Sequence, residues 1–361
     1  MNSRTRFLAA CRAEETDRPP AWMMRQAGRY LPEYREVRSG STFLGMVHDP
    51  ERAAEVTLQP IRRYGMDAAV IFCDILVPPA AMGMDVEFVE GKGPVLGPPL
   101  RDRDAVEGLR DFVAEEETGF LAQSIKNVRA ELGEERAIVG FCGAPFTVAS
   151  YMVEGQSSRN FENTKRMMLG ERETFDRLLT RVVDNSIGYL RMQVEAGADV
   201  VQVFDSWGGS LSAELYRERL LPHVARLVAE AKGFGVPVIL YVNGCTHLLE
   251  VMADSGADVL GIDWRVNPAE ATARVGDRVA LQGNLDPCTL FAPPEVVREE
   301  AARTLAAFEG QRGYIFNLGS GILPKTPLDS VQALWDTVLV NPGPAPLAGS
   351  SPGSSRGSAH P

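Results

Sequence analysis

The sequence predicts an α/β protein built as a single (β/α)8 TIM barrel. Glycine turns that close helical stretches are followed by apolar strands, as in GMDAAVIFCD, GADVVQVFDS and GADVLGIDW. These strands are apolar throughout and end abruptly in polar residues, which is typical of parallel strands buried on both faces. The main alternative is an open doubly wound sheet, but no glycine-rich nucleotide-binding motif follows any strand. Repetition of the strand–helix unit therefore favours the barrel.

The predicted elements alternate along the chain. Apolar runs with polar ends predict eight strands, at 20–24, 67–74, 137–145, 197–206, 236–243, 257–263, 278–284 and 313–317. Helical patterns are expected at 50–64, 102–133 and 172–196. Residues 84–97 alternate around Gly91 and Gly93, which indicates a hairpin inserted after the second strand.

The barrel domain is expected to cover residues 1–340. Residues 341–361 are mainly Pro, Gly, Ser and Ala, with almost no large apolar side chains. Such a segment cannot bury enough surface to offset the entropy lost on ordering. We therefore expect a disordered tail over 341–361.

Composition narrows the class of partner and the compartment. A net charge of −11 argues against nucleic acid or an anionic membrane as the main partner. The five cysteines are scattered without a C-x-x-C pair, so a disulfide framework is not expected. The longest apolar run, 236–242, is too short to span a bilayer, and no secretory segment is evident at the N-terminus. We expect a soluble, cytoplasmic protein.

One basic stretch stands out in this acidic chain. Residues 24–38 (MRQAGRYLPEYREVR) contain four arginines. Guanidinium groups stay charged and pair with carboxylates through two hydrogen bonds, so the cluster predicts a pocket for a small polyanion. A solvated helix face with Arg–Glu pairs is the alternative. It fits Arg35 and Arg38 better than Arg25 and Arg29, which lie where a buried strand is expected to end.

Active sites of parallel barrels lie at the carboxyl ends of the strands. Those ends supply the candidate residues Arg25, Gln26, Arg29, Asp74, Gly143, Asp205, Ser206, Asn243, Asp263, Asn284, Asn317 and Ser320. Periodicity alone does not rank them, and no histidine–carboxylate–nucleophile set is evident among them.

Two segments resemble the hallmark motifs of the uroporphyrinogen decarboxylase family. They are residues 20–38, which contain MRQAGRYLPEYR, and residues 140–155, GFCGAPFTVASYMVEG. Further matching stretches are VIFCDILVPPAAMGMDV, GADVLGIDWRV, LQGNLDP and FNLGSGILP, so the similarity covers roughly residues 5–340. The resemblance implies a (β/α)8 homodimer that needs no cofactor and binds no metal. It would convert uroporphyrinogen III to coproporphyrinogen III by turning four ring acetates into methyl groups.

The resemblance also implies where the substrate binds. Its contacts fall on Arg25, Gln26, Ala27, Gly28, Arg29, Asp74, Tyr151 and Ser206, with Phe43, Arg38 and Phe204 near the same cleft. The substrate carries eight carboxylates around four pyrrole N–H groups, so arginines suit its rim and an acceptor suits its centre. Asp74 would stabilise the cationic pyrrole intermediate, with Arg25 and Tyr151 as the other catalytic candidates.

One position departs from the family pattern. Members usually have Asn-Leu-Gly-His where this chain has Asn317 to Ser320. Serine can donate a hydrogen bond to a carboxylate but carries no charge near neutral pH. An essential role for histidine at this position is therefore in doubt, although Ser320 remains a candidate substrate contact. Serine at this position also leaves a second function open, that of a family relative that binds porphyrinogen without converting it.

A second alternative is a zinc-dependent corrinoid methyltransferase of the same fold. Cys245 and His247 follow a predicted strand and motivate it. Zinc sites need three or four ligands, and a third ligand is not evident. Such relatives also place the histidine before the cysteine, so we expect no metal here.

Overall fold

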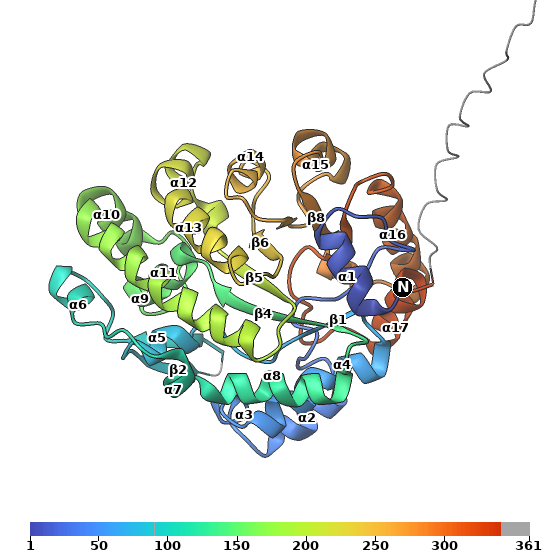
Figure 1. The fold of residues 1–361 in the computed structure, drawn as a ribbon, viewed down its shortest axis with the longest axis horizontal. Helices are drawn as coiled ribbons and strands as arrows, with labels where there is room; N and C mark the ends of the chain where they lie inside the picture. Colours follow the sequence, from blue (N-terminus) through green and yellow to red (C-terminus); the bar gives the residue numbers. More distant parts are fainter. Residues whose placement is uncertain (90, 341–361) are drawn as a thin grey trace, which may run out of the picture.

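A computed structural model describes residues 1–89 and 91–340. The predicted tail at 341–361 lies outside the described residues. At the centre, seven parallel strands form a curled sheet in the order β1-β4-β5-β6-β7-β8-β9 (Figure 1). These strands are β1 (Ala68–Val70), β4 (Ala137–Gly143), β5 (Val200–Asp205), β6 (Val238–Val242), β7 (Val259–Gly261), β8 (Ala280–Leu285) and β9 (Tyr314–Leu318).

Helices cover the outside of this sheet, as in TIM-barrel-like folds (Figure 1). The helices are α1 (Ser3–Cys11), α2 (Pro32–Ser39), α3 (Phe43–Val47), α4 (Pro50–Tyr64), α5 (Val77–Ala81), α6 (Arg103–Glu107), α7 (Ala114–Glu117), α8 (Gly119–Leu132), α9 (Pro145–Glu154), α10 (Glu162–Gly170), α11 (Arg172–Glu195), α12 (Ala213–Arg219), α13 (Leu221–Lys232), α14 (Leu249–Ala253), α15 (Pro268–Val275), α16 (Pro294–Ala307) and α17 (Leu328–Val338). Two short 3₁₀ turns are η1 (Gly208–Ser210) and η2 (Pro287–Phe291). No helix among the described residues is both long enough and apolar enough to cross a membrane.

Helix α4 shows how local sequence fixes an element. The Asp49 carboxylate accepts hydrogen bonds from the backbone N–H groups of Glu51 and Arg52, and Pro50 occupies the first turn. Gly65 ends the helix at φ 75°, a left-handed conformation that suits glycine. The predicted helix at 50–64 is thereby confirmed.

The hairpin is present where the alternating pattern placed it. Strands β2 (Asp85–Val89) and β3 (Gly93–Gly97) pair antiparallel, with Asp85 opposite Gly97. The helix expected over 102–133 is wrong as one element, because it divides into α6, α7 and α8. Between α6 and α7 the backbone bonds to neighbouring segments and not along a helix. The Arg110 N–H donates to the Met82 carbonyl, and the Phe112 N–H donates to the Asn185 side chain.

Residues 20–24, where the first strand was expected, form only an isolated bridge between Ala21 and Phe316 of β9. The Trp22 N–H donates to the Phe316 carbonyl at 3.2 Å, and the Asp67 N–H donates to the Ala21 carbonyl at 2.9 Å. This short segment therefore bonds to β9 on one side and to the start of the β1 region on the other.

A buried ion cluster fixes the same segment. Asp67 is fully buried and accepts hydrogen bonds from Arg6 at 2.9 Å, from Arg18 at 2.7 Å and from the Ala21 N–H at 2.8 Å. Charge-assisted bonds of this kind are strong where solvent is excluded. The cluster joins the N-terminal helix, the entering chain and the sheet.

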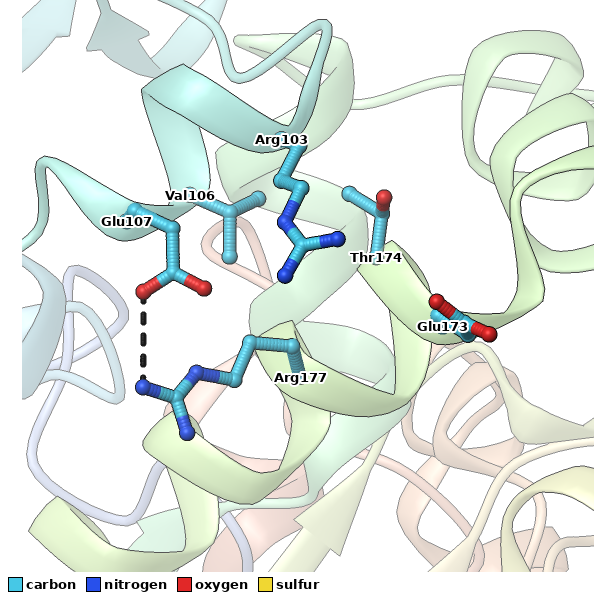
Figure 2. A pocket seen from close by; sticks show the side chains of 6 residues that line it. All are labelled: Arg103, Val106, Glu107, Glu173, Thr174 and Arg177. Atoms are coloured by element: carbon cyan, nitrogen blue, oxygen red, sulfur yellow. Dashed lines mark hydrogen bonds and ion pairs between the residues drawn. The ribbon is translucent and has the colours of Figure 1, made fainter.

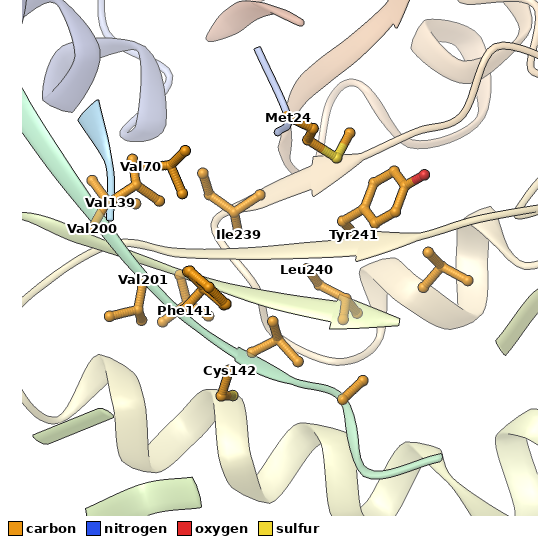
Figure 3. Close-up of a cluster of buried hydrophobic side chains, with 14 of the residues drawn as sticks. Met24, Val70, Val139, Phe141, Cys142, Val200, Val201, Ile239, Leu240 and Tyr241 are labelled. Carbon is orange, nitrogen blue, oxygen red and sulfur yellow. The ribbon is translucent and has the colours of Figure 1, made fainter. Parts of the chain in front are cut away.

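Apolar side chains pack on both faces of the sheet (Figure 3). Strands β4 and β6 are buried along their whole length, including Val139, Ile239 and Leu240. A polar chain crosses this interior: the Trp22 indole donates to the Gln282 side chain at 2.8 Å, and Gln282 donates to Gln202 at 3.1 Å. The centre of the sheet is thus a packed core and not a pore.

Replacing Asp67 by Asn should destabilise the fold strongly. Arg6 and Arg18 would keep their charges but lose the buried carboxylate that balances them, which typically costs about 3–5 kcal/mol. Urea unfolding monitored by circular dichroism measures this change. Glu300→Gln, which breaks the exposed Arg303–Glu300 pair, is the control and should cost less than about 1 kcal/mol. Equal effects of the two substitutions would contradict the role assigned to the cluster.

Candidate active site

Arg25 lies at the carboxyl end of the sheet. It immediately follows residues 20–24, whose backbone lies between β9 and the start of β1 in space. The Met24 N–H donates to the Asn317 side chain at 3.1 Å, and the Met24 carbonyl accepts from the Ile322 N–H at 3.0 Å. Arg25 itself has φ 60°, a left-handed conformation that is uncommon for a residue with a side chain. The loop after β9 therefore holds the backbone that carries this arginine.

Asp74 lies in the loop after β1, four residues beyond the end of the strand. Its carboxylate is half-buried and accepts a hydrogen bond from the Leu76 N–H at 2.9 Å. Burial raises the pKa of Asp74 to about 6, against the opposing effects of the Leu76 bond and the Arg25 charge. The predicted strand over 67–74 is too long, because the chain leaves the sheet after Val70.

Tyr151 of α9 belongs to the same neighbourhood. Burial, with a smaller contribution from the Asp74 charge, raises the pKa of its hydroxyl to about 12, and the Arg25 charge opposes this rise. Asp74 and Arg25 are therefore close enough to Tyr151 to affect its ionisation, and Arg25 affects that of Asp74. The structure brings together the three residues that the sequence proposed as catalytic, although their chemical roles remain predictions.

Tyr151 packs against a cluster of aromatic rings formed by Trp207 and Phe161. Its ring lies 4.1 Å from the Trp207 ring, and Trp207 lies 5.0 Å from Phe161, measured between centroids. Ser206 precedes Trp207 at the end of β5 and is half-buried. Sequence reasoning did not single out Trp207, although it directly follows a candidate strand end.

The inserted hairpin supports Phe43. The Phe43 ring lies 4.6 Å from Phe88 of β2 and 5.4 Å from Phe72, again between centroids. Phe204 contacts Phe141 and Tyr241 in the same way, at 5.4 and 6.0 Å. Both candidate aromatic residues are half-buried at the edge of the core.

The remaining residues of the arginine-rich segment differ in exposure. Gln26 is fully buried and donates to the Ala68 carbonyl at 3.1 Å, so its side chain has no surface left for a ligand in this structure. Ala27 and Gly28 are half-buried, and Arg29 is exposed. Within the described part of the chain, the Arg25 and Arg29 guanidinium groups form no ion pair.

The other two arginines of the segment bond to backbone. Arg35 donates to the Arg29 and Tyr30 carbonyls at 2.8 and 3.0 Å, and Arg38 donates to the Ser41 carbonyl. They brace the loops around α2. Within the described residues neither arginine forms the Arg–Glu pair that the helix-face alternative predicts, and Glu33 pairs with Arg63 of α4 instead.

Ser320 follows β9 and is half-buried. Burial raises the pKa of the neighbouring Tyr241 hydroxyl, and a hydrogen bond with Ser320 opposes that rise. Tyr241 donates to the Gly319 carbonyl at 3.0 Å. At the position where the family resemblance implied histidine, this chain thus has a small hydroxyl beside a buried tyrosine.

The pair behind the zinc alternative is not arranged as a ligand set. Cys245 is buried, and its N–H donates to the Asp263 carboxylate at 2.8 Å. His247 is exposed, with Nε2 2.7 Å from the Leu211 carbonyl. Over residues 1–89 and 91–340, no group of three or more His, Cys, Asp or Glu side chains is placed to hold a metal ion.

Other polar strand ends hold the loops in place. Asp205 accepts from Thr147 at 2.7 Å and from Tyr216 at 3.1 Å, while Asn284 donates to the Asp263 and Val266 carbonyls. Gly143 is buried and Asn243 accepts from Arg265. These residues explain why polarity at a strand end alone could not identify the site.

Two cavities lie outside the sheet. One of about 370 Å³ is bordered by α6 and the start of α11, where Arg177 pairs with Glu107 at 3.3 Å (Figure 2). No strand residue lines it, so it is separate from the strand ends. Another, of about 310 Å³, is lined by Asp74 together with residues of α3, α5 and β2.

The protein is thus a TIM-barrel-like protein. At the carboxyl end of its sheet it carries a half-buried carboxylate and arginines that form no ion pair with the described residues. The family model described as Uroporphyrinogen decarboxylase (URO-D) matches residues 2–339. The uroporphyrinogen decarboxylase of Sorangium cellulosum is 47% identical over 333 residues, covering 92% of this chain and 95% of that protein. That of Alkalilimnicola ehrlichii is 46% identical over 338 residues, covering 92% and 93%. The chain belongs to the uroporphyrinogen decarboxylase family.

Solved structures agree on the fold. A methyltransferase from Methanosarcina mazei superimposes with a TM-score of 0.80 at 24% identity, covering 93% of this chain and 98% of that one. A B12-independent methionine synthase from a Shewanella species gives 0.54 at 11% identity, covering 80% and 87%. At these identities the likeness concerns architecture alone.

Asp74→Asn should stabilise the protein at neutral pH. The folded pKa near 6 exceeds the ordinary value of 3.8, so the proton is held more tightly in the folded state. This group therefore favours folding at low pH, and that contribution is lost as the pH rises through about 6. Asparagine keeps the acceptor for Leu76 without the buried charge. The stability gain should grow between about pH 4 and 6 and reach on the order of 2 kcal/mol.

Urea unfolding of the Asp74→Asn variant at a series of pH values measures this difference. Asp85→Asn, on the exposed hairpin, is the matched control. A stability gain that does not change with pH would contradict the assigned cause.

Proposed function

We propose that this protein decarboxylates the four acetate side chains of uroporphyrinogen III to give coproporphyrinogen III, without a cofactor. Family membership over residues 2–339 carries the proposal. The unpaired cations at the carboxyl end of the sheet support it, because the substrate's rim consists of carboxylates. The net charge of −11 does not prevent a local basic mouth from steering this anion.

Arg25 and Arg29 are assigned to the substrate's carboxylates. Each charge-assisted hydrogen bond contributes roughly 1.5–3 kcal/mol, so two arginines supply several kcal/mol of positioning. Ser206, Ser320 and Tyr151 are assigned to further polar contacts. Ala27 and Gly28 are assigned to contacts between their backbone and the substrate. Gln26 is assigned to holding the turn that carries these two residues, through its hydrogen bond to the Ala68 carbonyl.

Phe43 lines the rim near the hairpin, and Phe204 forms part of the floor. Both are proposals that the aromatic contacts of these residues support. Apolar walls exclude water, which strengthens the electrostatic interactions of a bound substrate.

Asp74 is assigned to the centre of the macrocycle. A proton adds to the pyrrole carbon, and the positive charge spreads to the ring nitrogen. The acetate C–C bond then breaks, carbon dioxide leaves, and the bonding electrons neutralise the ring. A second proton converts the methylene carbon to methyl, and loss of the first proton restores the pyrrole. An ionised Asp74 stabilises the cation in this sequence. Tyr151 and Arg25 orient the reacting acetate.

Further features belong to the same proposal. The barrel is taken as a closed (β/α)8 barrel in which residues 20–22 occupy the position between β9 and β1, which their backbone bonds on both sides support. The catalytic domain spans 1–340, with 341–361 as an appended tail. The enzyme is proposed to act as a homodimer in the cytoplasm.

The sharpest test of Asp74 is anaerobic conversion of uroporphyrinogen, with the products oxidised and separated by chromatography. Asp74→Asn should lower kcat on the order of 10²–10³-fold, as removal of a charge-stabilising group typically does. Wild-type kcat/KM should fall as the pH drops below about 6, because Asp74 then becomes protonated. Near wild-type turnover by the variant would exclude the assigned role.

Ser320 motivates a second candidate, a relative that binds porphyrinogen without converting it. Ser320→His distinguishes the two functions. If the natural protein is an active decarboxylase, the variant should change turnover by less than about tenfold, since one uncharged hydrogen bond is worth about 1 kcal/mol. A gain of several orders of magnitude would favour the non-catalytic relative. Zinc in stoichiometric amount would instead revive the methyltransferase alternative.

A further inference from the structure

Gly321 lies in the loop after β9, directly beside Arg25. A Cβ atom built on Gly321 would lie 2.5 Å from Cδ of Arg25, 2.8 Å from Cγ and 3.0 Å from Nε. These are the three nearest atoms, and all belong to the one arginine. The absence of a side chain at Gly321 therefore makes the space that the Arg25 side chain occupies.

The glycine is not required by the backbone at this position. Gly321 is not among the residues with positive φ, so alanine fits its backbone conformation without strain. The contact also involves the middle of the arginine side chain, since Cγ and Cδ are closest. The arginine could not avoid a methyl group by moving its end alone; the whole side chain would have to rotate about an earlier bond.

We propose that Gly321 is a positioning residue that directs the Arg25 guanidinium toward Asp74 and the substrate. The loop holds the backbone of the arginine through the Ile322–Met24 hydrogen bond and leaves room for its side chain at Gly321. Arg25 is exposed and forms no ion pair with the described residues, so its close approach to Gly321 is the contact to which we assign its direction. This inference rests on the proposed function for its effect on catalysis, but not for its effect on Arg25.

Gly321→Ala tests the proposal in the full-length protein. Displacement of the guanidinium by about 1 Å can cost up to about 10²-fold, so kcat/KM for uroporphyrinogen should fall on the order of 10–100-fold. Gly40→Ala is the matched control: Gly40 ends α2 in the same arginine-rich region, has φ −98° and has no atom within 4 Å of an added Cβ. It should change kcat/KM by less than about twofold.

A double-variant cycle separates positioning from a general structural role. Arg25→Ala removes the side chain that the new methyl group would meet. Gly321→Ala should then have little further effect on kcat/KM, because residues that act through one contact are not additive. If Gly321→Ala alone fails to fold, the double variant should still fold. An undiminished effect in the Arg25→Ala background would overturn the proposal.

The ionisation of Asp74 provides a readout that does not depend on activity. Arg25 lowers the pKa of Asp74, so turning the guanidinium away should raise it. Carbon-13 NMR of labelled aspartate carboxyl groups, followed against pH, measures the change. The titratable and charged groups that face Asp74, or line the cavity it borders, are Arg25, Cys73, Tyr151, Tyr189, His48, Arg110 and Glu117.

The Asp74 titration midpoint should rise in Gly321→Ala and in Arg25→Ala, and stay unchanged in Gly40→Ala. An unchanged midpoint in Gly321→Ala would overturn the proposal even if the enzyme decarboxylates uroporphyrinogen. Conversely, a wild-type protein without decarboxylase activity would overturn the proposed function, while the NMR titration would still decide whether Gly321 positions Arg25.

Discussion

The short segment between β9 and β1 is the constraint on which the candidate site depends. Ala21 and Trp22 bond to the neighbouring backbone on both sides. The buried Asp67 carboxylate anchors the same segment by accepting a hydrogen bond from the Ala21 N–H. Met24 is then tied to Asn317 and Ile322, so the next residue, Arg25, emerges at a defined place. A cation on a free loop would lose much of its binding contribution to the entropy of ordering. Here folding already fixes the backbone next to Arg25, so substrate binding has to order only the exposed side chain.

The buried charge of Asp74, at the carboxyl end of the sheet, lowers the stability of the folded protein near neutral pH. Asp74 is held where burial raises its pKa to about 6, and only one backbone bond and the Arg25 charge oppose this. A carboxylate in this environment is less stable than it would be in water, and is ready to balance a cation that develops beside it. Fully paired carboxylates such as Asp67, by contrast, are committed to the fold. The difference in pairing separates Asp74, the acid that we propose to be functional, from the structural Asp67.

The departure at Ser320 is easier to understand in this setting. Ser320 lies beside Tyr241 of β6, whose hydroxyl donates to the Gly319 carbonyl and so ties the loop after β9 to β6. The same loop bonds to Met24 through Ile322 and borders Arg25 at Gly321. One loop therefore connects Ser320, where the resemblance implied histidine, with Arg25.

The sequence alone determined the parallel α/β fold, the inserted hairpin, the family and the candidate residues, because buried strands, turn glycines and long motifs are local patterns. Polarity at strand ends could not separate Asp205, Asn284 and Asn317, which hold loops, from Asp74, and only the family resemblance singled Asp74 out. The sequence also contained no sign of Trp207, Tyr241 or Gly321. Their roles arise from contacts with residues distant along the chain, and only tertiary packing brings such residues together.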